Sequence, residues 1–212
     1  MFPDLTRDDV FRLETRRLWL RWPRQADVAD IVRGAGAKAV AEMTSAIPHP
    51  YSPEHGRAFV MEARRRNMEG ALLTLAVTPR SRPEQVIGVV SIYPSRQGGG
   101  PELGYWIGDD HWGQGFATEA ARALIDAFFS YTGGTELSAS ARVINPDSRR
   151  VLEKCGFGQT GSGLEIFPAR GGLLPVDHFR LDRRKWESFK AWGRTGYVAG
   201  QGETPVQAVA FH

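Results

Sequence analysis

The chain contains a glycine-bearing stretch whose residues suit the binding of a phosphate group. The sequence HWGQGFA at His111–Ala117 runs directly into a segment whose apolar residues recur at helical spacing, which predicts a helix over 118–131. Gly113 and Gly115 let the backbone turn sharply and approach a ligand without an intervening Cβ. The first N–H groups of a helix lack intrahelical partners and lie at the positive end of its dipole. We therefore expect an anion site here, with a diphosphate as its natural ligand.

The glycine spacing excludes two common phosphate-binding motifs. The stretch has no Lys-Ser or Lys-Thr pair after its glycines, so it is not a P-loop. It is not the Gly-x-Gly-x-x-Gly motif of dinucleotide-binding folds either, because Thr118 stands where the third glycine would be. Two glycines before a helix also suit an ordinary turn, so this stretch alone does not identify a ligand.

A second polar stretch begins another predicted helix. Asn145 precedes Pro146, and Gly156 follows Cys155, which is the start-and-stop pattern of a helix over 145–155. Cys155 is the one cysteine of the chain, which excludes an internal disulfide and a multi-cysteine metal site. We expect it to be a small buried residue and not a nucleophile. The five histidines are too scattered to predict a metal site, so we expect no bound metal.

The spacing of apolar residues predicts the strands and helices that would position these two stretches. Ser52, Pro53 and Glu54 form a helix start, with a serine N-cap and proline at the first helical position. Strands are predicted over 16–22, 72–77, 86–93, 102–107 and 137–143, with weaker ones over 157–160, 164–167 and 178–181. Helices are predicted over 25–40, 53–67, 118–131 and 145–155, with one further helical turn over 186–189.

Length and composition indicate one ordinary globular domain. The chain has 212 residues, of which 42% are hydrophobic and 24% charged. It has no apolar run long enough to cross a bilayer, and the N-terminal residues lack the apolar core of a signal peptide. We therefore expect a cytoplasmic protein without a membrane partner. The net charge of +3 permits an acidic ligand but does not imply a nucleic acid, so none is expected.

Four separated motifs carry a resemblance to a known family. They are LETRRLWLR at Leu13–Arg21, LGYWIG at Leu103–Gly108, WGQGFATEA at Trp112–Ala120 and NPDSRRVLEKCGF at Asn145–Phe157. With these motifs the chain resembles the GCN5-related N-acetyltransferase (GNAT) superfamily, in particular its RimJ/RimL-like branch of ribosomal-protein N-terminal acetyltransferases. The resemblance implies an α/β (α+β) fold with a mixed, mostly antiparallel twisted sheet, a splayed parallel strand pair and helices on both faces. It implies an acetyltransferase domain over 13–189, between an N-terminal extension (1–12) and a C-terminal tail (190–212).

The resemblance also implies acetyl-CoA as the acetyl donor. Its pantetheine arm would lie between the strands at 102–107 and 137–143, as an added strand does. Backbone groups of Trp106 and Ile107 would pair with the pantetheine amides, and Asn145 would contact the same region. Asn145 also suits a plain helix N-cap, and both roles can hold together. The amides holding the diphosphate would be those of Gly113, Gln114, Gly115, Phe116, Ala117 and Thr118.

The reaction that the resemblance implies needs two proton movements, one from the attacking amine and one toward the departing sulfur, and each has a candidate catalytic residue. Many family members carry a tyrosine at the position that is Leu152 here, which cannot donate. The resemblance to the RimJ/RimL-like branch instead implies a serine three residues after the asparagine, here Ser148, which would hydrogen-bond to the departing sulfur. Glu102, at the start of a splayed strand, would accept the proton of the attacking amine through a water molecule. Each also has a structural interpretation, as a first-turn helix residue and as a solvated strand-edge carboxylate. His111 and His178 are expected to be structural.

The acceptor is expected to be a primary amine, most simply a protein or peptide N-terminal α-amine. An α-amine, with a pKa of about 8, loses its proton more readily than a lysine at about 10.4. Tyr51, His49 and Phe167 are the expected wall of the acceptor pocket. A small-molecule amine, such as a polyamine or an aminoglycoside, is the enzymatic alternative, and a non-catalytic acyl-CoA-binding regulatory module is the other. The protein would be a monomer or a homodimer.

Overall fold

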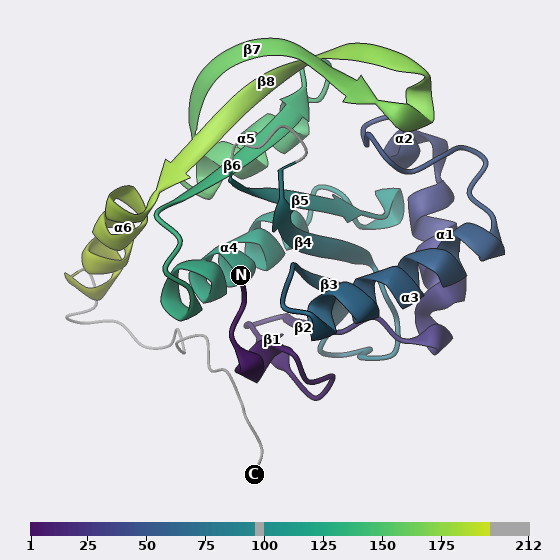
Figure 1. Ribbon diagram of the computed structural model, residues 1–212, viewed down its shortest axis with the longest axis horizontal. Coiled ribbons are helices and arrows are strands. Elements are labelled where there is room, and N and C mark those ends of the chain that lie inside the picture. Colours follow the sequence, from purple (N-terminus) through teal and green to yellow (C-terminus); the bar gives the residue numbers. More distant parts are fainter. Residues whose placement is uncertain (96–99, 196–212) are drawn as a thin grey trace.

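One mixed sheet organises the chain (Figure 1). The computed structural model describes residues 1–95 and 100–195, with side chains up to residue 190. The strand order is β1-β2-β3-β4-β5-β6-β8-β7, and the described strand pairs are antiparallel except β5–β6. The strands are β1 (Arg12–Glu14), β2 (Leu18–Arg21), β3 (Leu73–Pro79), β4 (Gly88–Pro94), β5 (Pro101–Ile107), β6 (Glu136–Arg142), β7 (Gly158–Phe167) and β8 (Gly172–Asp182).

Helices cover both faces of this sheet. The helices are α1 (Val28–Gly36), α2 (Lys38–Ala41), α3 (Pro53–Met68), α4 (Phe116–Tyr131), α5 (Pro146–Lys154) and α6 (Arg183–Thr195). Neighbouring residues of a strand point to opposite faces. On β3, Leu75 and Val77 join the main core with α4, while Ala76 joins a smaller cluster with Ile31 of α1 and Val60 of α3. The predicted fold class is therefore confirmed.

Strands β5 and β6 separate from each other after a single point of contact. Both have seven residues, yet their only register pair is Glu102 with Ser138, close to the start of each. In contrast, β4 pairs with β5 from Pro101 through Ile107, and β6 pairs with β8 along its whole length. The unpaired backbone edges of β5 and β6 therefore diverge toward their C-terminal ends, as the resemblance implied.

Helix starts match the sequence expectation most closely. The Ser52 side chain accepts a hydrogen bond from the N–H of His55, with Pro53 at the first position of α3. Asn145 Oδ1 accepts from the N–H of Ser148 at 3.0 Å, with Pro146 at the first position of α5. These caps depend on three or four consecutive residues, which is why the local sequence predicts them.

Four predicted elements differ in the structure. The single helix expected over 25–40 is a 3-10 turn followed by α1 and α2, which separate at Ala37, just after Gly36. The two weak strands expected over 157–160 and 164–167 are one strand, β7, with a register shift between Gln159 and Gly161. The expected turn over 186–189 is a 13-residue helix, α6, and an additional strand, β1, precedes β2. Long-range pairing, which sequence periodicity does not report, extends these elements.

Described residues at or near both predicted domain boundaries pack against the rest of the domain. Phe2 is buried in the main core, with its ring 6.2 Å from that of Phe128, and its N–H donates to the carbonyl of Gly70. At the other end, the Trp186 ring stacks on Phe129 at 5.1 Å, which holds α6 against α4. The predicted tail begins within α6, and its residues from 196 onward lie outside the described chain. The division at 12 and 190 remains a prediction.

Candidate active site

The glycine stretch forms an exposed turn into α4. Gly113 has φ +73° and Gly115 has φ +77°, backbone conformations that disfavour side chains with a Cβ. Gly115 is the N-cap of α4 and has no side chain to accept bonds from the first turn. A Cβ at Gly113 would meet nothing within 4 Å, and residues 112–115 are exposed. The turn therefore presents the N-terminal amides of α4 to solvent, as the anion-site prediction requires.

Arg17 links this turn to the edge of the sheet. Its Nη1 donates to the carbonyl of Gln114 at 3.0 Å, and its guanidinium lies 4.6 Å from the ring centre of Phe116. Its Nε donates to Glu119 Oε2 at 2.7 Å, and the Thr15 hydroxyl donates to the same carboxylate at 2.6 Å. Burial raises the pKa of Glu119, but these hydrogen bonds and the charge of Arg17 outweigh it, so the pKa lies below its ordinary value. The ionised Glu119 therefore holds Arg17 beside the turn.

Removing the Arg17 guanidinium is expected to weaken CoA binding without unfolding the protein. Arg17→Met should raise the dissociation constant of CoA about three- to tenfold, because one positive charge beside the diphosphate and one bond to the turn are lost. Isothermal titration calorimetry measures this. Arg122→Met is the matched control. Arg122 lies on α4, the helix that begins at this turn, but its guanidinium donates to the carbonyl of Lys154. Equal affinities for Arg17→Met and wild type would contradict the assigned role.

Trp112 and Trp106 fix the exit of β5. The Trp112 indole Nε1 donates to the carbonyl of Ile107 at 2.7 Å and so ties the turn to the strand end. The Trp106 side chain points to the face of the sheet opposite Ile107, where it packs against α1. A Cβ at Gly34 of α1 would lie 2.9 Å from the Trp106 ring, so glycine at this position lets the helix lie directly on the ring. The backbone of Trp106 and Ile107 is therefore held rigidly beside the gap between β5 and β6. Their pairing with a pantetheine arm remains a prediction.

Tyr105 and Ser148 meet on the α4–α5 side of the sheet. The Tyr105 hydroxyl lies 2.9 Å from Ser148 Oγ and 3.2 Å from the carbonyl oxygen of Ser148. Burial raises the pKa of the Tyr105 phenol, which keeps it protonated. Leu152, one turn further along α5, is 1% exposed in the main core. We did not identify Tyr105 from sequence, although alternation along ELGYWI places it on the core side with Leu103 and Ile107.

Glu102 lies on the opposite face, in a polar cavity of about 350 Å³. The Ser140 hydroxyl lies 3.3 Å from Glu102 Oε1 and 3.0 Å from Glu165 Oε2, so its one hydrogen is shared between two carboxylates. His178 Nδ1 is 3.3 Å from the other oxygen of Glu165. Strand β5 contributes Glu102, β6 contributes Ser140, and the β7–β8 hairpin contributes Glu165 and His178. Sequence reasoning found Glu102 alone, because only strand pairing brings the others to it.

The predicted acceptor-wall residues lie in different environments. Tyr51 packs beside the smaller apolar cluster, and burial raises its pKa to about 12. His49 Nδ1 is 3.1 Å from the carbonyl oxygen of Gly36. Phe167 is 4% exposed and lies beneath the guanidinium of Arg142, 5.9 Å from its ring centre. Of the three, Phe167 is therefore positioned as a packing residue of the hairpin, and no contact with an acceptor follows from its placement.

The hairpin end contacts the segment that follows α2. The N–H of Ala169 donates to the carbonyl of Ser45 at 3.1 Å, and the guanidinium of Arg170 donates to the carbonyls of Ala41 and Ile47. Arg142 on β6 donates to the carbonyl of Glu42. The hairpin end and the loop after α2 are therefore in direct contact, and their role as walls of an acceptor pocket remains a prediction.

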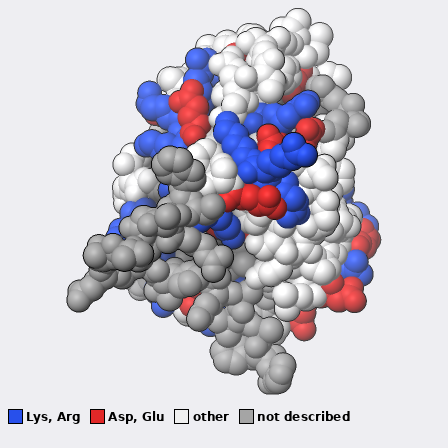
Figure 2. Space-filling view, turned by 90° about the vertical axis from the view of Figure 1, so that its left-hand side faces the viewer, with Lys and Arg blue, Asp and Glu red and all other residues white. Residues whose placement is uncertain are grey.

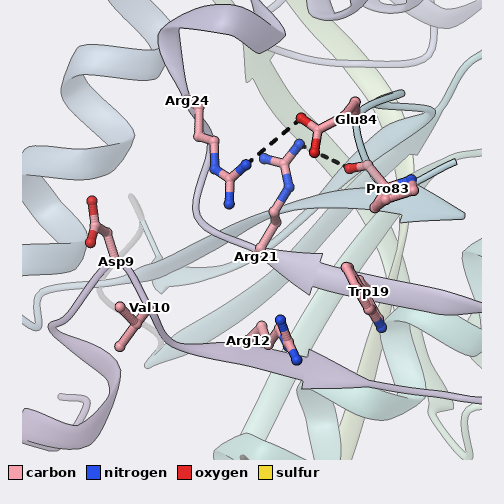
Figure 3. A pocket seen from close by; sticks show the side chains of 8 residues that line it. All are labelled: Asp9, Val10, Arg12, Trp19, Arg21, Arg24, Pro83 and Glu84. Atoms are coloured by element: carbon pink, nitrogen blue, oxygen red, sulfur yellow. Dashed lines mark hydrogen bonds and ion pairs between the residues drawn. The ribbon is translucent and has the colours of Figure 1, made fainter. Parts of the chain in front are cut away.

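A second cavity lies at the β1–β2 edge, away from the parted strands (Figure 3). It measures about 390 Å³ and is lined by arginines whose charges have partners. Arg21 is buried in an ion pair with Asp27 at 2.8 Å, and Arg24 lies 3.8 Å from Glu84. Because these charges compensate one another, we assign no ligand to this cavity.

The described residues, 1–95 and 100–195, contain neither a cluster of metal-ligating side chains nor a membrane-spanning helix. No group of three or more histidine, cysteine, aspartate or glutamate side chains in this part of the chain could hold a metal ion. No helix within the same ranges is long and apolar enough to cross a membrane.

Comparisons with known proteins agree on one family. Residues 17–158 match the family described as "Acetyltransferase (GNAT) domain". The chain is 32% identical over 104 residues to "Uncharacterized N-acetyltransferase p20" of Bacillus licheniformis, covering 49% of this chain and 58% of that protein. It is 33% identical over 79 residues to the "Ribosomal-protein-serine acetyltransferase" of Escherichia coli, covering 36% and 43%. The chain thus spans about half the length of these curated relatives.

The fold of the chain resembles that of a solved acetyltransferase structure. Mycobacterium smegmatis RimJ, in complex with CoA-disulfide, superposes with a TM-score of 0.72 over 92% of this chain and 98% of that one. The two sequences are 20% identical, so this likeness shows a shared fold. It agrees with the mixed sheet, the single parallel pair and the helix-covered faces described above.

Proposed function

The chain belongs to the GNAT acetyltransferase family, whose members use acetyl-CoA, and from that premise we propose that it acetylates a primary amine. The protein or peptide N-terminal α-amine is the proposed acceptor. The observation that carries the proposal is the gap between β5 and β6, which opens beside the exposed amides at the start of α4. These amides would hold the diphosphate, and the divergent strand edges would hold the pantetheine arm.

The pleat of the two strands divides the chemistry between two faces of the sheet. Glu102 points to the face of the polar cavity, whereas Tyr105 points to the face where α5 carries Ser148. Strand residues whose positions differ by an odd number point to opposite faces, so this division follows from the sequence positions of the two residues. The amine would enter on the Glu102 side, and the sulfur would leave on the Ser148 side.

The reaction would proceed by direct attack. A water molecule passes one proton of the ammonium to the Glu102 carboxylate, and the neutral nitrogen attacks the thioester carbonyl. The C–N bond forms, the C–S bond breaks, the nitrogen releases its second proton to solvent, and the thiolate leaves with a hydrogen bond from the Ser148 hydroxyl until solvent protonates it. Glu102 then returns its proton to solvent. Burial raises the pKa of the Cys155 thiol to about 12, which keeps it protonated and supports a mechanism without a covalent enzyme intermediate.

The charge of the cavity favours an acceptor with a single positive charge. Glu136 lies 3.3 Å from Arg180, so the lining does not carry three uncompensated carboxylates. A polyamine or an aminoglycoside carries several positive charges and would need more acidic residues. An N-terminal α-amine carries one charge and deprotonates near pH 8. The names of relatives that act on ribosomal proteins point to the same class.

Charges on the surface do not favour a polyanionic partner. Figure 2 shows Lys and Arg side chains next to Asp and Glu side chains on one face of the molecule. Ion pairs within one helix, such as Arg65 with Glu62 on α3, mix the two charges in the same way. Mixed charges of this kind do not make the continuous basic surface that a nucleic acid selects.

An amine panel tests the proposed function. The protein is incubated with acetyl-CoA and short peptides with a free α-amine, the same peptides with a blocked α-amine, spermidine and an aminoglycoside. We expect a mass increase of one acetyl group on the free-amine peptides and none on the blocked ones. Transfer only to the small amines would support the alternative acceptor. Binding of acetyl-CoA without transfer to any amine would support the regulatory module and contradict the proposal.

Ser148→Ala tests the donor to the departing sulfur. It should lower kcat about 10- to 100-fold, toward the low end of general-acid contributions, because the thiolate then leaves without that hydrogen bond. The KM for acetyl-CoA should change little, since the backbone of α5 is kept. Ser148→Thr retains a hydroxyl and is the matched variant, expected to keep more activity than Ser148→Ala. A kcat for Ser148→Ala within twofold of wild type would exclude Ser148 from this role.

A further inference from the structure

We propose that Tyr105 is a positioning residue that orients the Ser148 hydroxyl toward the departing sulfur. The proposal rests on the proposed function and assigns a role to a residue that acts through Ser148. Tyr105 lies on β5, one edge of the gap, while Ser148 lies in the first turn of α5. Their contact therefore crosses from the strand to the helix where the thioester would lie.

The Tyr105 hydroxyl contacts two oxygen atoms of a single residue. Its oxygen is 2.9 Å from Ser148 Oγ and 3.2 Å from the Ser148 carbonyl oxygen. The aromatic ring packs against the main core, which fixes where the hydroxyl can reach. The N–H of Ser148 is also held, because it donates to Asn145 Oδ1 at 3.0 Å. Both the backbone and the hydroxyl of Ser148 are therefore constrained before any ligand binds.

The direction of the hydrogen bond decides what Ser148 can do. A serine hydroxyl has one hydrogen and two acceptor positions, and a phenol has one hydrogen. When Tyr105 donates to Ser148 Oγ, the serine hydrogen is left to point elsewhere. A developing negative charge on sulfur attracts that hydrogen, and the chain from phenol to serine to thiolate becomes mutually polarised. Burial of Tyr105 keeps its hydrogen in place, so this donor persists over the working pH range.

A merely structural tyrosine would also satisfy its hydroxyl on Ser148, so the test must separate the two roles. A structural role affects stability and binding, whereas a positioning role affects kcat and depends on the Ser148 hydroxyl. The single variants Tyr105→Phe and Ser148→Ala and the double variant form a complete cycle. Tyr131→Phe is the matched control, because Tyr131 is a half-buried tyrosine that packs against the main core at the far end of α4.

Steady-state kinetics with the preferred amine give the readout, with thermal unfolding and CoA calorimetry as checks on folding and binding. Tyr105→Phe should lower kcat about five- to tenfold, with KM for acetyl-CoA and CoA affinity within twofold of wild type. In the Ser148→Ala background the same change should lower kcat less than twofold. Tyr131→Phe should leave kcat within twofold.

Two results would overturn the proposal. One is a wild-type kcat in Tyr105→Phe, and the other is an equal loss of kcat on removing the phenol with and without the Ser148 hydroxyl. If Tyr105→Phe loses only stability or CoA affinity and keeps a wild-type kcat, the role of Tyr105 is structural and the proposal is overturned. Absence of transfer by the wild-type protein to every amine would instead contradict the proposed function, so the two failures are distinguishable.

Discussion

Gly115→Glu is expected to abolish CoA binding. Gly115 is the N-cap of α4, and its position faces open space except for Arg17 Nη2, 3.5 Å from where a Cβ would be. A glutamate there places a negative charge beside the exposed amides that would hold the diphosphate. Two like charges about 4 Å apart repel by about 4 kcal/mol at an effective dielectric of 20, so affinity should fall at least about 100-fold. Isothermal titration calorimetry with CoA measures it.

Two controls separate charge from backbone strain. A side chain at left-handed φ costs roughly 1–2 kcal/mol, so Gly115→Glu also lowers the free energy of unfolding. Gly171→Glu introduces the same charge at φ +72° in the exposed β7–β8 turn, where a Cβ would meet nothing within 4 Å. It should lower stability similarly and leave CoA affinity unchanged. Gly115→Ala should bind more tightly than Gly115→Glu. Unchanged affinity in Gly115→Glu would contradict the placement of the diphosphate.

Local sequence predicts those features that a few consecutive residues determine. The caps of α3 and α5 at Ser52 and Asn145 follow from side chains that bond within one turn. The helical spacing of α4 and the alternation along β5 and β6 are equally local. The extent of β7 and α6 is not, because β7 carries glycines and polar residues and depends on pairing with β8. Stacking of Trp186 on Phe129 likewise supports α6 from a distant helix.

The same distinction separates the predicted site residues from those the sequence analysis missed. The turn at Gly113 and Gly115 is a local pattern, and the structure gives both glycines positive φ. The contact of Tyr105 with Ser148 spans 43 positions, and that of Arg17 with Gln114 spans 97. Neither pairing can be read from spacing along the chain. The two missed residues, Tyr105 and Arg17, each lie in one of the four family motifs, which indicates that motif residues without an assigned role are the first to examine in a structure.

The proposed base, Glu102, and the proposed hydrogen-bond donor to sulfur, Ser148, lie on opposite faces of the sheet. Glu102 and Ser148 need not contact each other, since the gap between β5 and β6 connects the two faces. In the proposed mechanism, proton removal from the amine and stabilisation of the thiolate are therefore separate events, each supported by its own residues. Ser140 and Glu165 surround the first, while Tyr105 and Asn145 constrain the second. Variants on one face should leave the other event intact.

Glu102→Gln is expected to lower kcat about 100-fold at neutral pH, within the range of general-base contributions. An amide keeps the size and the polar contacts of the side chain but cannot accept the proton of the ammonium. The acceptor must then arrive already neutral, so the rate of the variant should rise with pH until the α-amine has deprotonated, near pH 8. Rate–pH profiles of variant and wild type, measured with a free-amine peptide at saturating acetyl-CoA, test this.

Glu136→Gln is the matched control, because Glu136 lines the same cavity at the start of β6 and lies 3.3 Å from Arg180. It removes the same charge from the cavity, so a general electrostatic effect on acceptor binding would reduce activity in both variants and appear in KM. A loss of kcat confined to Glu102→Gln, with unchanged CoA affinity, assigns proton removal to Glu102. Equal losses in the two variants would mean that the cavity attracts the acceptor by its charge and that the base lies elsewhere.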